Sequence, residues 1–159
     1  MKLSPRQIVL SLLLGFILTL LGAFWAVQLV RTPPTNTVVD PMRLNLSEFR
    51  DLGLFKINHS SYVLRVVAKQ WVFDIGQHRD TPAVLQIPAG STLQIVATSM
   101  DIMHTILIPG FEAQSALPGK ISRVTYLFEQ PGTYVALCSE YCGPKHHEMT
   151  ITIEVFPAP

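Results

Sequence analysis

Two features are missing from this 159-residue sequence, and each absence excludes a class of protein. Lys and Arg number only 12 and do not cluster, which excludes a nucleic-acid-binding protein, because phosphate neutralisation requires clustered cations. A Cys-x-x-Cys-His motif is absent, so the sequence predicts no covalently attached haem c. The length leaves room for one ordinary domain and one additional element, but not for a second domain.

One long apolar run stands near the N-terminus and predicts a membrane anchor. Residues Ile8–Val27 contain no charged side chain, and a helix of this length spans a hydrocarbon core of roughly 30 Å. Lys2 and Arg6 precede the run and only Arg31 closely follows it, so the positive-inside tendency predicts a cytoplasmic N-terminus. A cleaved signal peptide is the alternative, although signal cores usually contain only about 7–15 apolar residues. We therefore expect residues 1–31 to form a single-pass anchor.

Beyond the anchor, the sequence predicts a connector followed by a β domain. Residues 32–61 hold prolines among Asn, Thr and Ser, which is a connector composition. In residues 62–159, short β-branched and aromatic runs alternate with Pro-Gly turns, and apolar residues alternate with polar ones within each run. This pattern is typical of a mainly β, antiparallel sandwich. The candidate strands are Val63–Ile75, Val84–Ile87, Thr92–Ala97, Thr105–Ile108, Ser122–Phe128, Thr133–Leu137 and Thr150–Phe156.

The stretch from Cys138 to Met149 carries the residues with metal chemistry. Between two candidate strands it holds two thiols, an imidazole and a thioether, at Cys138, Cys142, His146 and Met149. Such soft donors select copper or zinc rather than magnesium or calcium. Three other interpretations stay open: a disulfide that closes a very short loop, a zinc site that uses His147 and leaves Met149 idle, and a redox dithiol. Each leaves part of the donor set without a role, so copper is favoured.

The second cysteine distinguishes one copper ion from two. A single-copper site needs one Cys, two His and a weak axial Met, and Cys142, His146, Met149 and one histidine from elsewhere would supply them. Cys138 gains a role if two sulfurs bridge two copper ions. Sharing one electron among two metals and two sulfurs reduces the change in geometry per electron, which suits electron transfer. We therefore favour a two-copper centre.

The spacing Cys138-x3-Cys142-x3-His146-x2-Met149, preceded by Asp101-Ile102-Met103-His104, resembles the binuclear copper-A domain of cytochrome c oxidase subunit II. The single anchor makes the chain similar to the compact B-type haem–copper oxidases. The resemblance implies a cupredoxin-like antiparallel Greek-key sandwich over residues 62–159. The metal ligands that it implies are His104, Cys138, the backbone carbonyl of Glu140, Cys142, His146 and Met149.

The resemblance also implies roles beyond the copper ligands. Trp71 would receive the electron from the donor, although Val72 stands where the family often has a tyrosine, and packing in the core is the alternative role for Trp71. Asp101 would lie near the docking face, with Glu112 as a helper, and their charges would steer a basic donor. The carboxylate of Glu140 would contribute to a magnesium site shared with subunit I.

Together these features predict the subunit through which electrons enter a haem–copper terminal oxidase. It would accept electrons from a soluble cytochrome c or cupredoxin and pass them to haem in subunit I, which reduces oxygen. The implied location is the plasma membrane of a prokaryote, with the copper domain on the outer, periplasmic side of the bilayer. A membrane-tethered copper carrier for assembly is the main alternative, and the copper-A domain of a nitrous oxide reductase is another. Quinol oxidation is disfavoured because quinol-oxidising relatives lose the copper ligands, which this chain keeps.

Overall fold

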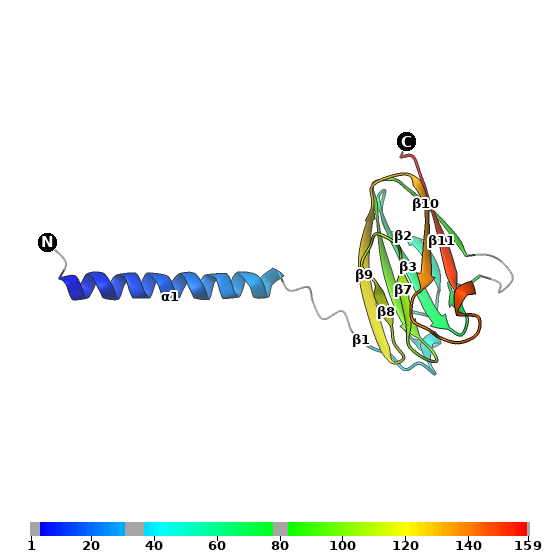
Figure 1. Cartoon of the computed structure of the whole chain (residues 1–159), viewed down its shortest axis with the longest axis horizontal. Helices are drawn as coiled ribbons and strands as arrows, with labels where there is room; N and C mark the ends of the chain where they lie inside the picture. Colours follow the sequence, from blue (N-terminus) through cyan, green and yellow to red (C-terminus); the bar gives the residue numbers. More distant parts are fainter. Residues whose placement is uncertain (1–3, 31–36, 78–82, 159) are drawn as a thin grey trace. The chain divides into compact units, whose positions relative to one another are not determined.

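The computed structural model describes residues 4–30, 37–77 and 83–158 of the chain (Figure 1). These residues belong to two compact units, Met1–Pro34 and Thr35–Pro159. The first unit contains one helix, and the second contains every strand that the structure describes.

The helix of the first unit, α1 (Pro5–Val30), has 26 residues. Ser4 and Gln7 form a capping box at its start: the Ser4 amide donates to Gln7 Oε1 at 2.8 Å, and the Gln7 amide donates to Ser4 Oγ at 3.4 Å. Pro5 suits the first helical position because it has no N–H to leave unpaired. Among the described residues, α1 is the one helix long and apolar enough to cross a membrane, with a mean hydropathy of 1.9 over Pro5–Ala23.

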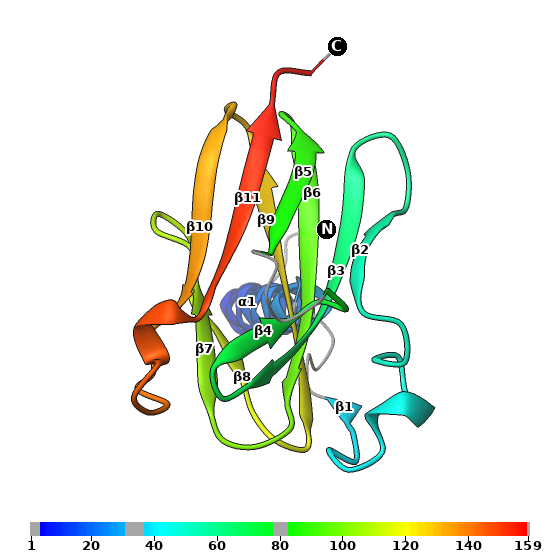
Figure 2. The same ribbon diagram turned by 90° about the vertical axis from the view of Figure 1, so that its right-hand side faces the viewer.

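The second unit consists of two β-sheets that face each other (Figure 2). Its strands are β1 (Thr37–Val38), β2 (Gly53–Lys56), β3 (Ser61–Lys69), β4 (Val72–Asp74), β5 (Val84–Pro88), β6 (Ser91–Ser99), β7 (His104–Leu107), β8 (Gln114–Ala116), β9 (Lys120–Phe128), β10 (Gly132–Cys138) and β11 (Thr150–Phe156). One sheet has the order β1-β9-β6-β3-β2, with β4 paired to β3, and the other has the order β5-β11-β10-β7-β8. Two short 3-10 helices, η1 (Leu44–Leu46) and η2 (His146–Glu148), lie outside the sheets.

The predicted mainly β sandwich is confirmed, with one difference in strand direction. Most neighbouring strands are antiparallel, but β3 pairs with β6 in parallel, and β5 pairs with β11 in parallel. In both cases the chain crosses to the other sheet between the two paired strands. The strands between the two partners supply the long connection that parallel neighbours require.

The main core lies between the two sheets, where side chains alternate along each strand. Leu93, Ile95 and Ala97 of β6 are fully buried, as are Ile151 and Ile153 of β11. These positions confirm the predicted alternation of apolar and polar residues. On the outer face of β6, Val96 is buried too, because a second apolar cluster covers it, whereas Thr92 and Gln94 are partly exposed.

The second cluster begins in the stretch between α1 and β3. Val39 and Phe49 pack there against Val67, Val96 and Ile121 on the outer face of the β1-containing sheet. In the same stretch β1 pairs with β9 and β2 pairs with β3. Part of the predicted 32–61 connector therefore contributes strands and buried side chains to the second unit. Its apolar residues have no regular period from which this packing could be predicted.

A turn at Gln70 and Trp71 divides the segment that the sequence predicts as one strand, Val63–Ile75. β3 ends before this turn, and β4 follows it and folds back to pair with β3 in the antiparallel direction. The segment contains no Gly or Pro, so the usual signals of a turn are missing. The turn allows Trp71 to contact Cys142, in the loop between β10 and β11.

Candidate metal centre

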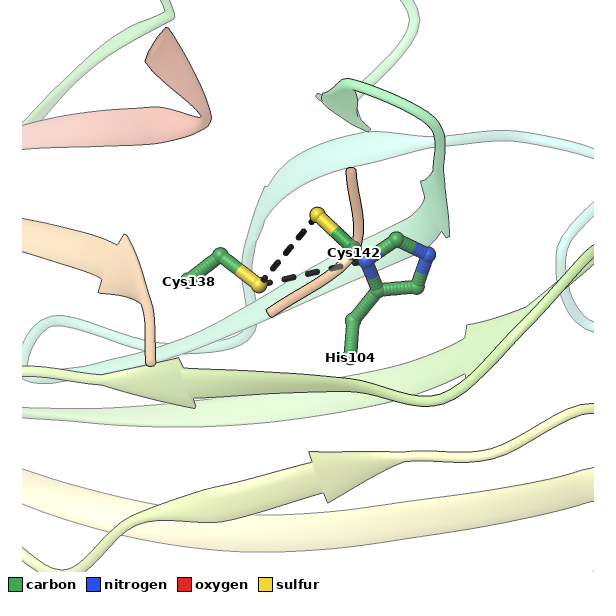
Figure 3. A group of neighbouring side chains, drawn as sticks. All are labelled: His104, Cys138 and Cys142. Atoms are coloured by element: carbon green, nitrogen blue, oxygen red, sulfur yellow. Dashed lines mark hydrogen bonds between the residues drawn. The ribbon is translucent and has the colours of Figure 1, made fainter. Parts of the chain in front are cut away.

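Three buried donor side chains meet where β7 begins and β10 ends (Figure 3). His104 is the first residue of β7, Cys138 is the last residue of β10, and these strands pair with Cys138 opposite Ile106. Cys142 comes from the loop that follows β10. The two Sγ atoms are 4.0 Å apart, and His104 Nδ1 lies 3.9 Å from Cys138 Sγ. All three donor atoms lie within 4.8 Å of one another, a spacing at which they could hold a metal ion.

His146 and Met149 lie beside the second sulfur of this cluster. His146 Nδ1 is 3.4 Å from Cys142 Sγ, and Met149 Sδ is 3.8 Å from it. Backbone hydrogen bonds place both side chains: the His146 amide donates to the Gly143 carbonyl at 3.0 Å, and the Met149 amide donates to the His146 carbonyl at 3.3 Å. The Cys138 amide donates to the Met149 carbonyl at 3.1 Å, which joins the two ends of the loop.

This donor set fits a soft metal ion. Both cysteines are free, and their Sγ separation of 4.0 Å is well above the roughly 2.05 Å of a disulfide bond. Thiolates bind zinc at about 2.3 Å, so an ion of that size fits in contact with both sulfurs. The carbonyl oxygen of Glu140 lies 3.2 Å from Cys138 Sγ and adds a further donor near the cluster. Thiolate, imidazole and thioether are the donors that copper prefers.

The remaining described histidines lie away from the cluster. His147 Nε2 lies 3.9 Å from Glu148 Oε1, and its side chain is 77% exposed. His59 is exposed, and His78 lies outside the described residues. The fold of the loop therefore turns His146, rather than His147, toward the sulfurs. A tetrahedral zinc site that uses both neighbouring histidines does not fit this arrangement.

The pKa values of two acidic groups at the cluster, Cys142 and Asp101, are shifted in opposite directions from their usual values. Burial raises the pKa of Cys142 to about 11, and Cys138 adds to the rise because two neighbouring thiolates would repel each other. Burial also raises the pKa of Asp101, but hydrogen bonds from His104, Gln70 and Ile102 outweigh burial and hold this pKa below its usual value. The metal-free chain therefore keeps Cys142 protonated at neutral pH while Asp101 is ionised.

Metal binding must displace the proton of the Cys142 thiol, which predicts an affinity that rises with pH. At any pH below about 11, the pKa of Cys142, one proton leaves this thiol when the metal binds. The metal affinity therefore rises roughly tenfold per pH unit for each proton released. Competition against a Cu(I) chelator of known pH dependence, at pH 7 and pH 9, measures this slope on the full chain. A copper affinity that does not change over this range would contradict thiolate ligation, and Cys142→Ser should flatten the slope by one proton.

Residues 138–149, from the end of β10 to the start of β11, are called the metal-binding loop below. Trp71 and Gln70 both contact this loop, at the same carbonyl group. Trp71 Nε1 donates to the Cys142 carbonyl oxygen at 3.1 Å, and Gln70 Nε2 donates to the same oxygen at 2.7 Å. Gly143 permits this approach, because it has a φ of +125° and a Cβ there would lie 2.7 Å from Trp71 Nε1. The sequence predicted a functional role for Trp71 but none for Gln70 or Gly143. The one sequence feature that could have indicated Gln70 is its position directly before Trp71.

Of the two acidic residues predicted to guide a donor, the structure brings one to the cluster. Asp101 Oδ1 lies 2.8 Å from His104 Nε2 and accepts from the Ile102 amide at 2.7 Å, while Oδ2 accepts from the Gln70 amide at 2.6 Å. The Asp101 side chain is 28% exposed. Glu112 is exposed in the loop between β7 and β8, at the opposite end of β7 from His104.

Several known proteins with sequences similar to this chain are described as cytochrome c oxidase subunit 2. A family model described as "Cytochrome C oxidase subunit II, periplasmic domain" matches residues 45–156. Cytochrome c oxidase subunit 2 of Thermus thermophilus is 36% identical over 75 residues, which cover 46% of this chain and 56% of that protein. Its counterpart in Brettanomyces naardenensis is 31% identical over 114 residues, which cover 70% of this chain and 44% of that protein. This chain spans about half the length of the curated relatives it matches.

Solved structures with the same fold include a chain of a heme-copper terminal oxidase dimer. That chain is 29% identical, with a TM-score of 0.62, and the match covers 96% of this chain and 99% of that one. The periplasmic domain of subunit II of cytochrome oxidase from Bradyrhizobium japonicum is 23% identical, with a TM-score of 0.50, and the match covers 60% of this chain and 83% of that one. The likeness to this second structure concerns the fold alone, and it confirms the predicted cupredoxin-like sandwich.

Proposed function

Because this chain belongs to the cytochrome c oxidase subunit II family, we propose that it is the subunit through which electrons enter a haem–copper terminal oxidase. Family membership makes it a component of an oxidoreductase complex, and the oxidase dimer that holds a similar chain implies association with other oxidase subunits. In this proposal a soluble cytochrome c or cupredoxin reduces the chain. The chain then passes electrons to haem in subunit I, where oxygen is reduced.

The observation that carries the proposal is a pair of buried thiols with one imidazole beside each sulfur. His104 Nδ1 faces Cys138 Sγ, and His146 Nδ1 faces Cys142 Sγ. A single-copper site would leave one of the buried thiols without a role. We therefore assign a binuclear copper-A centre. Its proposed ligands are the bridging thiolates of Cys138 and Cys142, one imidazole each from His104 and His146, the thioether of Met149 and the backbone carbonyl of Glu140.

The protein contributes fixed geometry at this centre and keeps water from most of its donors, while His146 is half-buried. When bound, a copper pair would accept and release single electrons with little change in geometry, because two metals and two sulfurs share the charge. His104, Cys142 and Met149 are 0%, 2% and 1% exposed, so solvent does not reach these donors. Donors held in place before the reaction need no rearrangement when charge arrives.

Trp71 is the residue that we propose receives the electron from the donor. Its indole N–H donates to the Cys142 carbonyl, which connects the ring to a proposed ligand through one hydrogen bond and the cysteine backbone. Trp71 also packs against the main core, so the packing role expected as the alternative accompanies this contact.

Trp71→Phe should slow electron transfer from the donor while the copper centre stays intact. Phenylalanine keeps an aromatic ring but cannot donate the hydrogen bond that links the ring to the Cys142 backbone. We expect the barrier to electron transfer to rise by about 1 kcal/mol, the size of one such bond, which makes the step roughly fivefold slower. Rapid mixing with reduced cytochrome c measures this rate. Trp25→Phe, the same change at a tryptophan in α1, is the matched control and should leave the rate unchanged. Equal rates for Trp71→Phe and the original chain would remove Trp71 from the path.

The proposal also includes partners and a location. The chain would sit in the plasma membrane of a prokaryote with one pass through the lipid bilayer and a cytoplasmic N-terminus. Asp101 and Glu112 would steer a basic donor, in a manner that salt weakens. The Glu140 carboxylate is exposed and would offer a hard oxygen donor to a magnesium ion shared with subunit I.

Donor oxidation and copper retention together test the proposed function against a copper carrier. The copper-loaded full chain, in detergent, is mixed with reduced cytochrome c and with a reduced cupredoxin, and separately with an excess of Cu(I) chelator. We expect rapid single-electron oxidation of at least one donor and copper that the chelator does not remove within hours. Prompt loss of copper to the chelator without donor oxidation would support a carrier instead.

A further inference from the structure

We propose that Gln70 is a positioning residue that joins the two halves of the metal centre, by binding the Cys142 carbonyl through its side chain and Asp101 through its backbone amide. This inference rests on the proposed copper-binding function. His104 is the first residue of β7, whereas Cys142 belongs to the loop between β10 and β11. Gln70 lies in the turn between β3 and β4, which belong to the opposite sheet. It is therefore placed to hold both ligand segments from outside.

Gln70 makes two contacts, which we call its side-chain arm (to the Cys142 carbonyl) and its backbone arm (to Asp101). The side-chain arm fixes the peptide group of Cys142. Gln70 Nε2 donates to the Cys142 carbonyl oxygen at 2.7 Å, and Trp71 Nε1 donates to the same atom at 3.1 Å. A carbonyl oxygen has two lone pairs, so these two donors satisfy it completely. Because the carbonyl cannot rotate without breaking both bonds, the direction of the Cys142 side chain is also restrained.

The backbone arm of Gln70 acts on His104 through Asp101. The Gln70 amide donates to Asp101 Oδ2 at 2.6 Å, while Asp101 Oδ1 lies 2.8 Å from His104 Nε2. An ionised carboxylate only accepts hydrogen bonds, so Nε2 must carry the imidazole proton. Nδ1 is then the nitrogen with a free lone pair, and it faces Cys138 Sγ at 3.9 Å. Carboxylates that hold ligand histidines in this way stabilise metal sites.

The two arms depend on each other because they share one residue. The bond between the Gln70 amide and Asp101 holds the turn at the distance from which the side chain reaches Cys142. Loss of either arm should therefore weaken the other, and the two losses should not add. Gln70 is exposed at the surface, so we expect effects near the lower end of the roughly 10–100-fold range for residues that support metal ligands.

The test is a double-mutant cycle on copper release from the full chain, without any electron donor. We expect Gln70→Ala and Asp101→Asn each to speed copper release to a Cu(I) chelator by about tenfold, and the double variant to release copper about tenfold rather than a hundredfold faster. Gln70→Glu keeps the shape but turns an acceptor toward the Cys142 carbonyl, so it should behave like Gln70→Ala. Gln86→Ala removes a 2.8 Å bond to Glu154, far along the sheet on β5, and is the matched control.

The outcomes separate this inference from the proposed function and from a docking role. Release rates of Gln70→Ala and Gln70→Glu equal to those of Gln86→Ala would overturn the inference alone, as would a hundredfold effect in the double variant. A starting chain that never binds a pair of copper ions would overturn both the inference and the proposed function. If Asp101 served only to dock a donor, Asp101→Asn would leave donor-free copper release and the shape of the copper EPR spectrum unchanged, which would also contradict the inference.

Discussion

Cys138→Ser should abolish the spectrum of an electron shared between two copper ions and should leave at most one copper ion per chain. Serine replaces a soft thiolate with a hydroxyl that copper binds poorly, so no second sulfur remains to bridge two metals. The donors that stay near Cys142, which are His146 and Met149, still suit a single-copper site. EPR and copper analysis of the loaded full chain measure the effect.

Ser139→Ala is the control for this substitution, because Ser139 is the exposed neighbour of Cys138 and its side chain makes no contact within the cluster that the structure describes. It should retain two copper ions and the shared-electron spectrum. A Cys138→Ser variant with the original spectrum would show that Cys138 does not bridge, and the two-copper assignment would have to be abandoned.

Gly143→Ala should both destabilise the second unit and disturb the contact between Trp71 and the metal-binding loop. The added Cβ would lie 2.7 Å from Trp71 Nε1, and the φ of +125° is unfavourable for any residue with a side chain. The strained backbone costs about 1–3 kcal/mol and the overlap about 1–3 kcal/mol, so we expect a loss of roughly 3 kcal/mol in the free energy of unfolding. Denaturant unfolding measures that loss. Fluorescence reports the displaced Trp71 ring when Trp25→Phe is present in every variant compared, because the chain has two tryptophans.

Gly90→Ala separates the backbone effect from the overlap. Gly90 also has a positive φ, +79°, but a Cβ there meets nothing within 4 Å. It should therefore cost only about 1–2 kcal/mol and leave both Trp71 fluorescence and donor oxidation unchanged. Equal losses for the two variants, with the same Trp71 fluorescence, would mean that Gly143 does not control the approach of Trp71.

The metal-binding loop was predictable because its donors are close in the sequence. Cys138, Cys142, His146 and Met149 lie between two strands that pair directly, so a short loop has to bring them together. His104 is different, since it stands 34 residues before Cys138 and joins the cluster only because β7 pairs with β10. Composition and periodicity could not establish that pairing, and only the resemblance to a known family indicated His104.

The support around the cluster was not predictable, because it depends on how the two sheets pack. Gln70 reaches partners 31 and 72 residues away, at Asp101 and Cys142. No local pattern encodes such contacts, and the turn that presents Gln70 lacks Gly and Pro. The packing of Phe49 on the outer face of the sheet that contains β1 was not predictable for a similar reason, since its partners lie on β3, β6 and β9. The resemblance grouped Glu112 with Asp101 at one docking face, whereas the fold places them beyond opposite ends of β7.

The measurement that tests the two-copper centre most directly is EPR spectroscopy of the full chain loaded with copper, combined with a copper count. Two buried thiols 4.0 Å apart, with an imidazole beside each, predict a purple protein that holds two copper ions and one unpaired electron shared equally between them. A blue protein with one copper ion per chain, or a colourless one that holds zinc, would contradict the account.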